Sequence, residues 1–156
     1  MEKLYRLLYP MRIVLISASY NGKNNFMPAA WCFPLSFEPP IFGVAIAKKR
    51  HTYGLVHESR EFVINIPGAD LIEKIEKFGR TSGRDGDKFK EWNVIPEKSK
   101  KVGAFGIAEC LVSLECRVVN EIEIGDHILF CGEAVNITKR REGKGIYQKE
   151  DRIIEL

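Results

Sequence analysis

The chain is poor in the residues that usually bind metal ions or form redox pairs. It has 156 residues, of which 4 are cysteines and 3 are histidines. No two cysteines form a C-x-x-C pair, and no histidine lies at a spacing that would complete a zinc site. The sequence therefore predicts no metal site. Cys110 and Cys116 alternate with apolar residues, so we expect the cysteines to be buried, reduced packing residues rather than redox groups.

Two common nucleotide-binding signatures are also missing. No G-x-G-x-x-G motif follows a predicted strand, and the loop at residues 81–88 lacks the spacing of a nucleoside triphosphate loop. A reduced nicotinamide would therefore have to bind transiently and outside a Rossmann fold. Neither a Ser-His-Asp triad nor a glycosidase-like carboxylate pair is indicated, because His51 and His57 belong to one short segment.

The charge balance and the shortness of the apolar runs exclude further classes. The 24 basic and 21 acidic residues leave a net charge of +3, which argues against nucleic acid or membrane as the main partner. Near the N-terminus, Arg6 and Arg12 interrupt the apolar residues, so we expect neither a signal peptide nor a membrane span, and a cytoplasmic location. Length and apolar content predict a single domain over residues 1–156.

What the sequence does contain is a series of short apolar runs that are rich in β-branched and aromatic residues and are separated by Gly, Pro and Asn. Helical segments are almost missing from the last third, which disfavours a parallel α/β sheet. The pattern predicts a mainly β fold, a closed or half-open antiparallel barrel with a few helices. The predicted strands cover residues 12–19, 26–33, 41–47, 61–66, 107–120 and 127–139.

Helical patterns fall between these strands. Thr52 is the expected N-cap of the first helix, Asp70 and Glu73 are placed as a cap pair on the second, and Phe89 and Trp92 lie three apart on the buried side of the third. The predicted helices cover residues 52–58, 70–78 and 85–92.

Two cationic segments could hold a phosphate group. Residues 48–52, Lys-Lys-Arg-His-Thr, lie where a strand ends and a helix begins, and a helix N-terminus presents N–H groups and partial positive charge. Residues 81–88, Thr-Ser-Gly-Arg-Asp-Gly-Asp-Lys, combine hydroxyls, glycines and cations, and Arg84 offers a planar fork for phosphate oxygens. Taken alone, the same residues also fit a capped surface helix and a plain turn.

The order of these segments is similar to that of a known family. The chain reads Asn-Phe-Met-Pro-Ala-Ala-Trp at residues 25–31, Pro-Leu-Ser-Phe-Glu-Pro-Pro at 34–40, Glu-Phe-Val-Ile-Asn-Ile-Pro at 61–67 and Gly-Asp-His-Ile-Leu-Phe-Cys-Gly-Glu at 125–133. Together with the two cationic segments, this order resembles the flavin reductase-like family, whose members bind FMN on a split β-barrel. The resemblance covers most of the chain.

The resemblance implies an FMN site. In the family, the segment after the third strand helps to hold the phosphate, and the Ser-Gly-Arg-Asp element borders the flavin. Relatives often carry Thr or Ser in place of Ala29 and Ala30, so backbone contacts must suffice there. Pro28 lacks an N–H, so we expect it to interrupt strand pairing and leave a gap in the barrel wall. The implied cofactor-binding residues are Met27, Ala29, Ala30, Trp31, Ser36, Ala47, Lys49, His51, Thr52, Ser82, Arg84 and Lys88.

His127 is the catalytic candidate. Gly125 and Asp126 predict a hairpin turn just before it, and a plain strand start is the ordinary interpretation of this histidine. In the family, the matching histidine lies near the nicotinamide or substrate side of the flavin. A histidine there could donate a hydrogen bond or stabilise the charge of reduced flavin.

The implied function is that of an FMN-binding flavoprotein oxidoreductase, an NAD(P)H-dependent flavin or ferric reductase. NAD(P)H would be a transient co-substrate, and the acceptor could be free flavin, ferric iron, a partner oxygenase or an iron–sulfur protein. The resemblance also implies a homodimer with the flavin site at the subunit interface. The alternative in the same fold is an electron carrier of the flavoredoxin kind with no nicotinamide activity of its own.

A rival from another class is a small barrel that binds nucleic acid. The basic segments at 98–101 and 139–144 lie in loops, and Trp31, Phe33 and Phe37 could stack on bases. The basic residues are scattered between loops and are not interleaved with these aromatics, so the flavoprotein hypothesis is favoured.

Overall fold

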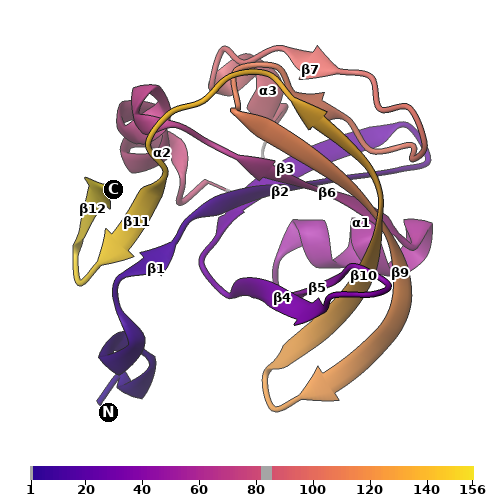
Figure 1. The fold of residues 1–156 in the computed structure, drawn as a ribbon, viewed down its shortest axis with the longest axis horizontal. Coiled ribbons are helices and arrows are strands. Elements are labelled where there is room, and N and C mark those ends of the chain that lie inside the picture. The colour runs from indigo at the N-terminus through magenta and orange to yellow at the C-terminus, as the bar shows by residue number, and fades with distance from the viewer. Residues whose placement is uncertain (1, 82–85) are drawn as a thin grey trace.

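A seven-stranded antiparallel sheet that curls into a half-open barrel forms the centre of the molecule (Figure 1). The computed structural model describes residues 2–81 and 86–156. The strand order is β3-β2-β6-β9-β10-β5-β4, so β3 and β4 are the two edges, and residues 30 and 31 join them across the split. The predicted mainly β split barrel is therefore confirmed. The strands are β2 (Val14–Tyr20), β3 (Lys23–Ala29), β4 (Cys32–Ser36), β5 (Ile41–Ala47), β6 (Glu61–Ile66), β9 (Val112–Ile124) and β10 (His127–Lys139).

Most of these strands follow the predicted boundaries. The predictions for β5, β6 and β10 agree with the structure at both ends, and the prediction for β2 is shifted slightly. Two predicted strands are wrong because each merges two separate elements. Residues 26–33 contain the end of β3 and the start of β4, and residues 107–120 contain the end of β8 and most of β9. Both breaks are occupied by apolar residues, Trp31 and Leu111, which the alternation pattern cannot distinguish from strand residues.

Pro28 does not interrupt the sheet. It lies inside β3, opposite Leu15 of β2, so the expected break at this proline is wrong. β3 is an edge strand, and an edge is where a sheet tolerates a residue that cannot donate a hydrogen bond. The opening in the barrel wall lies at residues 30 and 31 instead.

Several short elements were not predicted. β11 and β12 form a hairpin beside β1, and β7 pairs with β8. The hairpin turns at Glu150, whose φ of 55° is in the left-handed region. These elements have two to five residues each, too few for an alternation or a helical period to be recognised. They are η1 (Leu4–Leu8), β1 (Met11–Arg12), β7 (Pro96–Glu97), β8 (Gly106–Ile107), β11 (Ile146–Lys149) and β12 (Arg152–Glu155).

The helices are α1 (His51–Ser59), α2 (Ile72–Phe78), preceded by the short helix η2 (Ala69–Leu71), and α3 (Lys88–Glu91). The N-cap role predicted for Thr52 is wrong. Arg50 is the N-cap residue, and Thr52 lies buried in the first turn of α1. Its hydroxyl accepts a hydrogen bond from Asn25 of β3 instead of one from the helix backbone.

The predicted cap pair on the second helix is also wrong. Leu71 precedes α2 and makes no side-chain cap hydrogen bond within the described residues. Asp70 instead pairs with Arg141, with 3.2 Å between Oδ2 and Nη2. At the third helix, the side chain of Asp87 accepts a hydrogen bond from the N–H of Phe89. Phe89 and Trp92 are buried, as the three-residue spacing predicted.

Both faces of the sheet are covered. Leu15 and Ile16 are neighbours on β2, and both are fully buried in different clusters, because successive strand residues point to opposite faces. Ile16 packs inside the barrel with Phe62 and Phe130. Leu15 packs outside it in a cluster that includes Trp92 of the α3 region. The outer cluster fixes α2 and α3 against β3, where a pocket is found.

Free cysteines are distributed over both cores. Cys110, Cys116 and Cys131 are buried and Cys32 is half-buried, and all four are unpaired thiols, as predicted. Burial raises the pKa of Cys32 and Cys110 to about 12, so these thiols stay protonated near neutral pH. Among residues 2–81 and 86–156, no group of three His, Cys, Asp or Glu residues is arranged to hold a metal ion. In the same residues, no helix has both the length and the apolar character needed to span a bilayer.

Candidate functional site

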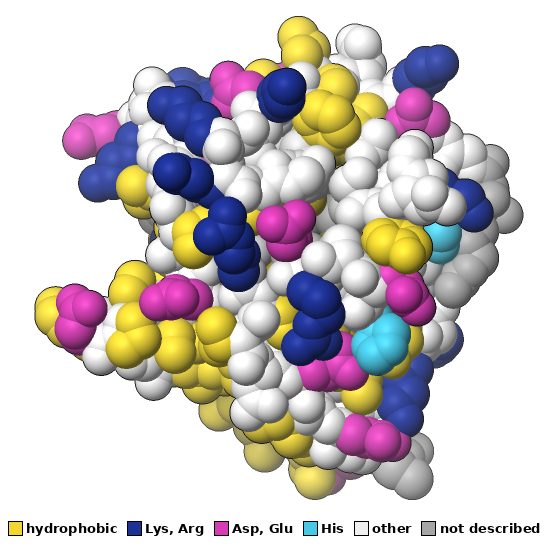
Figure 2. Space-filling view, turned by 90° about the vertical axis from the view of Figure 1, so that its right-hand side faces the viewer, with side chains coloured by type: hydrophobic (Ala, Val, Ile, Leu, Met, Phe, Trp, Pro, Cys, Tyr) yellow, Lys and Arg dark blue, Asp and Glu magenta, His cyan; other side chains and the backbone are white. Residues whose placement is uncertain are grey.

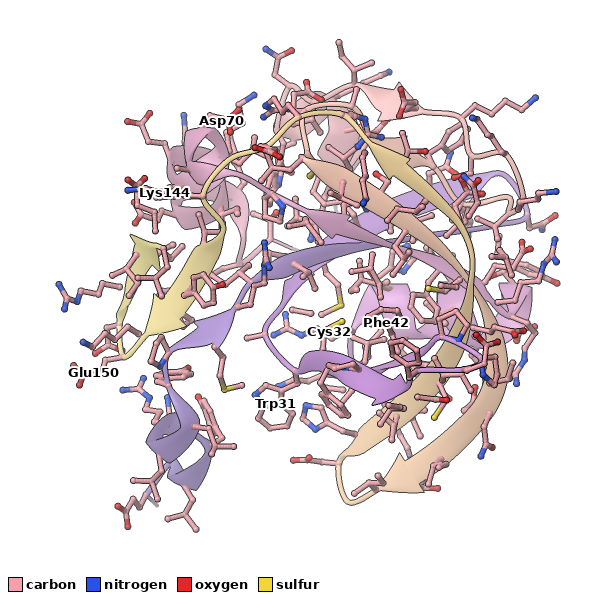
Figure 3. All side chains as sticks on the ribbon, viewed as in Figure 1. Trp31, Cys32, Phe42, Asp70, Lys144 and Glu150 are labelled. Carbon is pink, nitrogen blue, oxygen red and sulfur yellow. The ribbon has the colours of Figure 1, made fainter. Side chains whose placement is uncertain are left out.

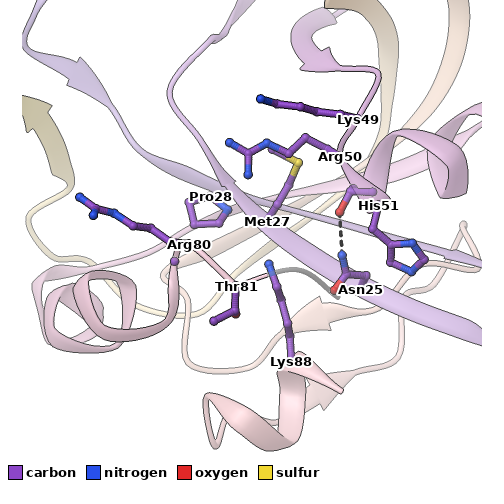
Figure 4. A pocket seen from close by; sticks show the side chains of 11 residues that line it. Asn25, Met27, Pro28, Lys49, Arg50, His51, Arg80, Thr81 and Lys88 are labelled. Atoms are coloured by element: carbon purple, nitrogen blue, oxygen red, sulfur yellow. Dashed lines mark hydrogen bonds between the residues drawn. The ribbon is translucent and has the colours of Figure 1, made fainter. Parts of the chain in front are cut away.

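A pocket of about 190 Å³ lies between β3, the start of α1, the end of α2 and α3 (Figure 4). Four cationic side chains line it: Lys49, Arg50, Arg80 and Lys88. We call this the cationic pocket. The two cationic segments of the sequence therefore meet in space, because α3 packs against β3 beside the beginning of α1. Its remaining lining residues are Asn25, Met27, Pro28, His51, Thr52, Gly79 and Thr81.

The N-terminus of α1 opens into this pocket. Arg50 is extended, with φ −73° and ψ 139°, and within the described residues its side chain forms no cap hydrogen bond. His51 and Thr52, the first two residues of α1, line the pocket. The first turn of a helix has N–H groups without intrahelical partners and carries partial positive charge. Helix and cations therefore favour the same kind of ligand, an anion.

Lys88 is the most constrained of the four cations. Only 2% of it is exposed, and its Nζ lies 6.0 Å from the centre of the Phe26 ring. Burial lowers the pKa of Lys88 to about 8, Glu91 counteracts this, and Arg50 lowers the pKa further. Among the described residues, no carboxylate forms an ion pair with Lys88. A buried ammonium of this kind is stabilised by a bound anion.

Two more hollows continue from the cationic pocket along the split of the barrel. A hollow of about 430 Å³ shares Pro28, Gly79 and Arg80 with it and is also lined by Ala29 and Ala30. Small side chains there leave the edge of β3 accessible. An apolar groove of about 690 Å³ follows, and Ala30 lines both. The groove is lined by Tyr5, Leu8, Met11, Arg12, Ala30, Trp31, Cys32, Phe33, Ala45, Ile124, Asp126, His127 and Leu129.

Trp31 and His127 stack on each other in the apolar groove. Their ring centres are 4.6 Å apart and their planes differ by 27°. Figure 3 shows Trp31 between the N-terminal helix and the β9–β10 hairpin, and Tyr5 of η1 packs edge-on against it. His127 is brought there because it is the first residue of β10 and pairs with Ala47, at the end of β5.

Asp126 holds the imidazole of His127 from the turn. His127 Nδ1 lies 2.7 Å from Asp126 Oδ1, and this hydrogen bond lowers the pKa of the Asp126 carboxyl. The turn is the predicted one, with Gly125 at a φ of 57°. A bond at Nδ1 leaves Nε2 as the ring nitrogen that a ligand can use. The groove therefore combines an apolar wall with one oriented imidazole.

Comparison with known proteins agrees with this geometry. The chain matches the model of the flavin reductase like domain over residues 4–152. The chain belongs to this family. An uncharacterized protein of Archaeoglobus fulgidus is 44% identical over 84% of this chain and 73% of the relative, and a ferric-chelate reductase (NAD(P)H) of the same organism is 29% identical over 86% and 78%. An FMN-binding protein from Thermus thermophilus shares the fold, with a TM-score of 0.89 and 23% identity over 99% of this chain and 91% of that one.

Within this family fold, the predicted site residues fall into three groups. Met27, Lys49, His51, Thr52 and Lys88 line the cationic pocket. Ala29 and Ala30 line the middle hollow, and Ala30, Trp31 and His127 line the apolar groove. Ser36 and Ala47, at the ends of β4 and β5, lie outside the linings of these three hollows. Ser82 and Arg84 lie outside the described residues.

Sequence reasoning missed other residues of the cationic pocket. Arg50 stands between two predicted residues, and Arg80 lies two residues after the end of the predicted helix 70–78. Asn25 is the first residue of the segment at residues 25–31 that carries the family resemblance. An Asn before an aromatic residue does not by itself indicate a binding role. Only the pairing of β3 beside α1 shows that it faces Thr52.

Proposed function

We propose that the protein is an FMN-dependent oxidoreductase of the NAD(P)H-dependent flavin or ferric reductase type. The observation that carries this proposal is Lys88, a buried cation in a pocket with three further cations and a helix N-terminus. That pocket continues along the barrel split into an apolar groove. This layout matches FMN, which has a phosphate group at one end and a flat ring system toward the other. The ferric-chelate reductase relative supports the reaction type.

The residues present fit FMN. Lys88, Arg50 and Thr52 offer charged and hydroxyl donors to a phosphate monoester. Further along the split, the small side chains of Ala29 and Ala30 leave backbone groups free to meet the polar edge of the ring system. When bound, FMN supplies the electron chemistry, accepting a hydride equivalent from a reduced nicotinamide and passing electrons to an acceptor.

The apolar groove is the proposed place for the nicotinamide or the acceptor. Its lining is largely apolar, which strengthens each polar contact made inside it once a ligand has displaced the water. His127 is held by Asp126 through Nδ1 and by stacking on Trp31, so its ring has a fixed orientation. In the imidazolium form of His127, Nδ1–H donates to Asp126 and Nε2–H remains to donate to the ligand. We assign this form the role of donating that hydrogen bond or balancing negative charge next to it.

The nucleic-acid alternative is disfavoured. Arg140 forms an ion pair with Glu97, and Arg141 pairs with Asp70, so this basic segment is partly neutralised. Figure 2 shows basic and acidic side chains interspersed on one face of the molecule. A nucleic-acid surface is usually a continuous basic patch with accessible aromatics, whereas Trp31 is stacked on His127.

A titration of the purified protein with FMN and with riboflavin tests the cofactor. FMN is expected to bind at least about tenfold more tightly, because a charge-assisted hydrogen bond is worth about 1.5–3 kcal/mol. Equal affinities would contradict phosphate anchoring. Anaerobic mixing of the FMN-loaded protein with NADH and with NADPH then tests the reaction. Bleaching of the flavin by either nicotinamide supports the reductase. If neither NADH nor NADPH bleaches the flavin, the electron carrier is supported.

A further inference from the structure

Asn25 and Thr52 form a buried polar pair at the cationic pocket. Their exposed fractions are 2% and 1%, and Asn25 Nδ2 donates to Thr52 Oγ1 over 2.9 Å (Figure 4). Within the part of the chain that the structure describes, Oδ1 of Asn25 has no hydrogen-bond partner although it is buried. A buried polar atom without a partner is costly and calls for an explanation, such as a ligand or a bound water.

Local structure does not require this pair. Asn25 lies opposite Ala18 in the β2–β3 ladder, which uses backbone groups only. Thr52 is not the N-cap of α1, and its helix neighbours Leu55 and Val56 belong to the barrel core. Apolar residues of similar shape would satisfy both elements, and β-branched Val would replace Thr52 without loss of packing. The polar atoms therefore point to a ligand.

The pair retains a donor whichever way the amide is turned. An amide carries two N–H donors and a hydroxyl carries one O–H donor. Since Asn25 donates to Thr52, the hydroxyl proton of Thr52 is left for another acceptor. With the amide reversed, the hydroxyl would donate to Oδ1, and the N–H groups of Asn25 would be left. In each case the pair offers a proton beside Lys88 and Arg50.

We infer that Asn25 is a specificity-determining positioning residue, which holds Thr52 so that the pair donates a hydrogen bond to the terminal phosphate of a flavin mononucleotide. The inference rests on the proposed function. Charge alone attracts any anion to the four cations, whereas a fixed donor of the pair selects for an oxygen at one place. Riboflavin carries a hydroxyl there and lacks the negative charge, so the pair separates the two flavins.

Affinities for FMN and riboflavin, measured by equilibrium titration of flavin fluorescence, test this inference. Thr52→Val and Asn25→Leu are each expected to weaken FMN binding by about tenfold or more and to leave riboflavin binding within about twofold. Thr52→Ser keeps the hydroxyl and is expected to bind FMN within about threefold of the natural chain. Asn24→Ala is the matched control, because Asn24 is the exposed neighbour on the same strand.

The double variant adds a second readout. Asn25→Leu combined with Thr52→Val is expected to weaken FMN binding about as much as the larger single change, because both residues act through one donor. If Asn25→Leu does not fold, Asn25→Asp replaces it. Its carboxylate accepts the Thr52 proton and repels phosphate, so it is also expected to weaken FMN binding and not riboflavin binding.

Some outcomes would overturn the inference. Equal losses for FMN and riboflavin in the Asn25 variants would assign Asn25 a structural role only. Unchanged FMN binding in Thr52→Val would show that the Thr52 hydroxyl does not contribute a hydrogen bond to the phosphate. Failure of the proposed function looks different, because the natural chain itself would then bind both flavins equally or bind neither.

Discussion

At the scale of single residues, the cationic pocket stands out because its polar groups are buried without full compensation. Lys88 is nearly inaccessible and its pKa is lowered to about 8 by burial, while Asn25 keeps an unpaired oxygen within the described residues. A buried ammonium reduces the stability of a protein and is therefore expected where a bound anion pairs with it. The amide of Asn25 can contribute to such a site only through its N–H groups, because its oxygen accepts. A change at Lys88 should then affect binding and stability in opposite directions.

Lys88→Met is expected to weaken FMN binding by about ten- to a hundredfold, because a charge-assisted hydrogen bond is lost. Riboflavin binding should hardly change. The ligand-free variant should be more stable to urea than the natural chain, since a buried ammonium without an ion pair among the described residues is replaced by an apolar side chain of similar length. Lys90→Met is the control, because Lys90 is exposed on the same helix. An unchanged FMN affinity in Lys88→Met would show that Lys88 does not bind the phosphate.

The pKa of Lys88 also predicts a pH dependence of binding. In the ligand-free chain burial lowers this pKa to about 8, and a bound phosphate would raise it again. Below pH 8 the ammonium is already charged, so its contribution to FMN binding is constant. Above pH 8 binding requires proton uptake, and the dissociation constant should rise by up to about tenfold per pH unit. Titrations between pH 7 and about 9.5 test this, and riboflavin should show no such rise.

The same lowered pKa has a second consequence with a defined sign. The unfolded chain holds the Lys88 proton up to the ordinary value of 10.5, whereas the folded chain releases it near 8. Between these values the unfolded state binds more protons, so the free energy of unfolding of the ligand-free protein should increase with pH through this contribution. The difference between the natural chain and Lys88→Met, measured by urea denaturation at each pH, isolates it.

At the scale of elements, the sequence patterns identify the long strands and not the connections. β5, β6 and β10 were predicted with both ends correct, because each is an apolar run bounded by Gly, Pro, Asn or charged residues. The N-cap of α1 was assigned to Thr52 on residue type alone. The fold places Asn25 against that hydroxyl, and a contact between β3 and α1 is not visible in local sequence.

The candidate site was predicted in part for the same reason. Lys49, His51 and Thr52 were identified because they share one run, and family resemblance added Lys88. Arg80 lies at the end of α2 and joins the pocket only through the packing of α2 against β3. Pro28 is predicted to interrupt the barrel wall, but it stays paired with β2, because an edge strand has no partner on its outer side that would need its N–H. The opening lies at residues 30 and 31 instead.

The β9–β10 hairpin positions His127, and a change there should affect reaction more than binding. His127→Ala is expected to slow the reduction of bound FMN by NAD(P)H by about ten- to a thousandfold, the range for losing an electrostatic or proton-handling group. FMN affinity should hardly change, because His127 lines the apolar groove and not the cationic pocket. Anaerobic stopped-flow absorbance separates the two. Asp126→Asn weakens the hydrogen bond to His127 Nδ1 and should slow the reduction less. A normal reduction rate in His127→Ala would show that His127 has no role in the reaction.

Two glycines test how the elements are packed. An added Cβ at Gly132 of β10 would lie 2.5 Å from Cζ of Phe62, so Gly132→Ala should destabilise the fold by about 1–3 kcal/mol. An added Cβ at Gly54, inside α1, meets nothing within 4 Å. Gly54→Ala should therefore stabilise the protein by about 0.5–1 kcal/mol. Urea denaturation measures both, and an equally stable Gly132→Ala variant would contradict the close packing of Phe62.

At the scale of the whole molecule, an apolar surface lies beside the split of the barrel. Leu4, Leu7 and Leu8 of η1 are 63%, 78% and 74% exposed. Leu8 also lines the apolar groove. Apolar side chains gathered at the rim of a groove favour contact with another molecule. We propose that a second copy of this chain covers this surface and closes the groove.

Light scattering over a dilution series, with flavin fluorescence recorded on the same samples, tests the dimer. The natural chain is expected to be a dimer at micromolar concentration, since a stable interface buries about 1,600 Å² in total. Leu4→Ser combined with Leu7→Ser should shift dissociation to higher concentration by at least about tenfold, because each change removes an apolar side chain that the dimer would bury. Flavin release should follow the same shift. Ile95→Ser is the control, since Ile95 is 65% exposed but lies next to β7, at the opposite end of the molecule from η1 in Figure 1. A monomer that keeps its flavin at every concentration would contradict the proposal and leave the groove open to solvent in the active protein.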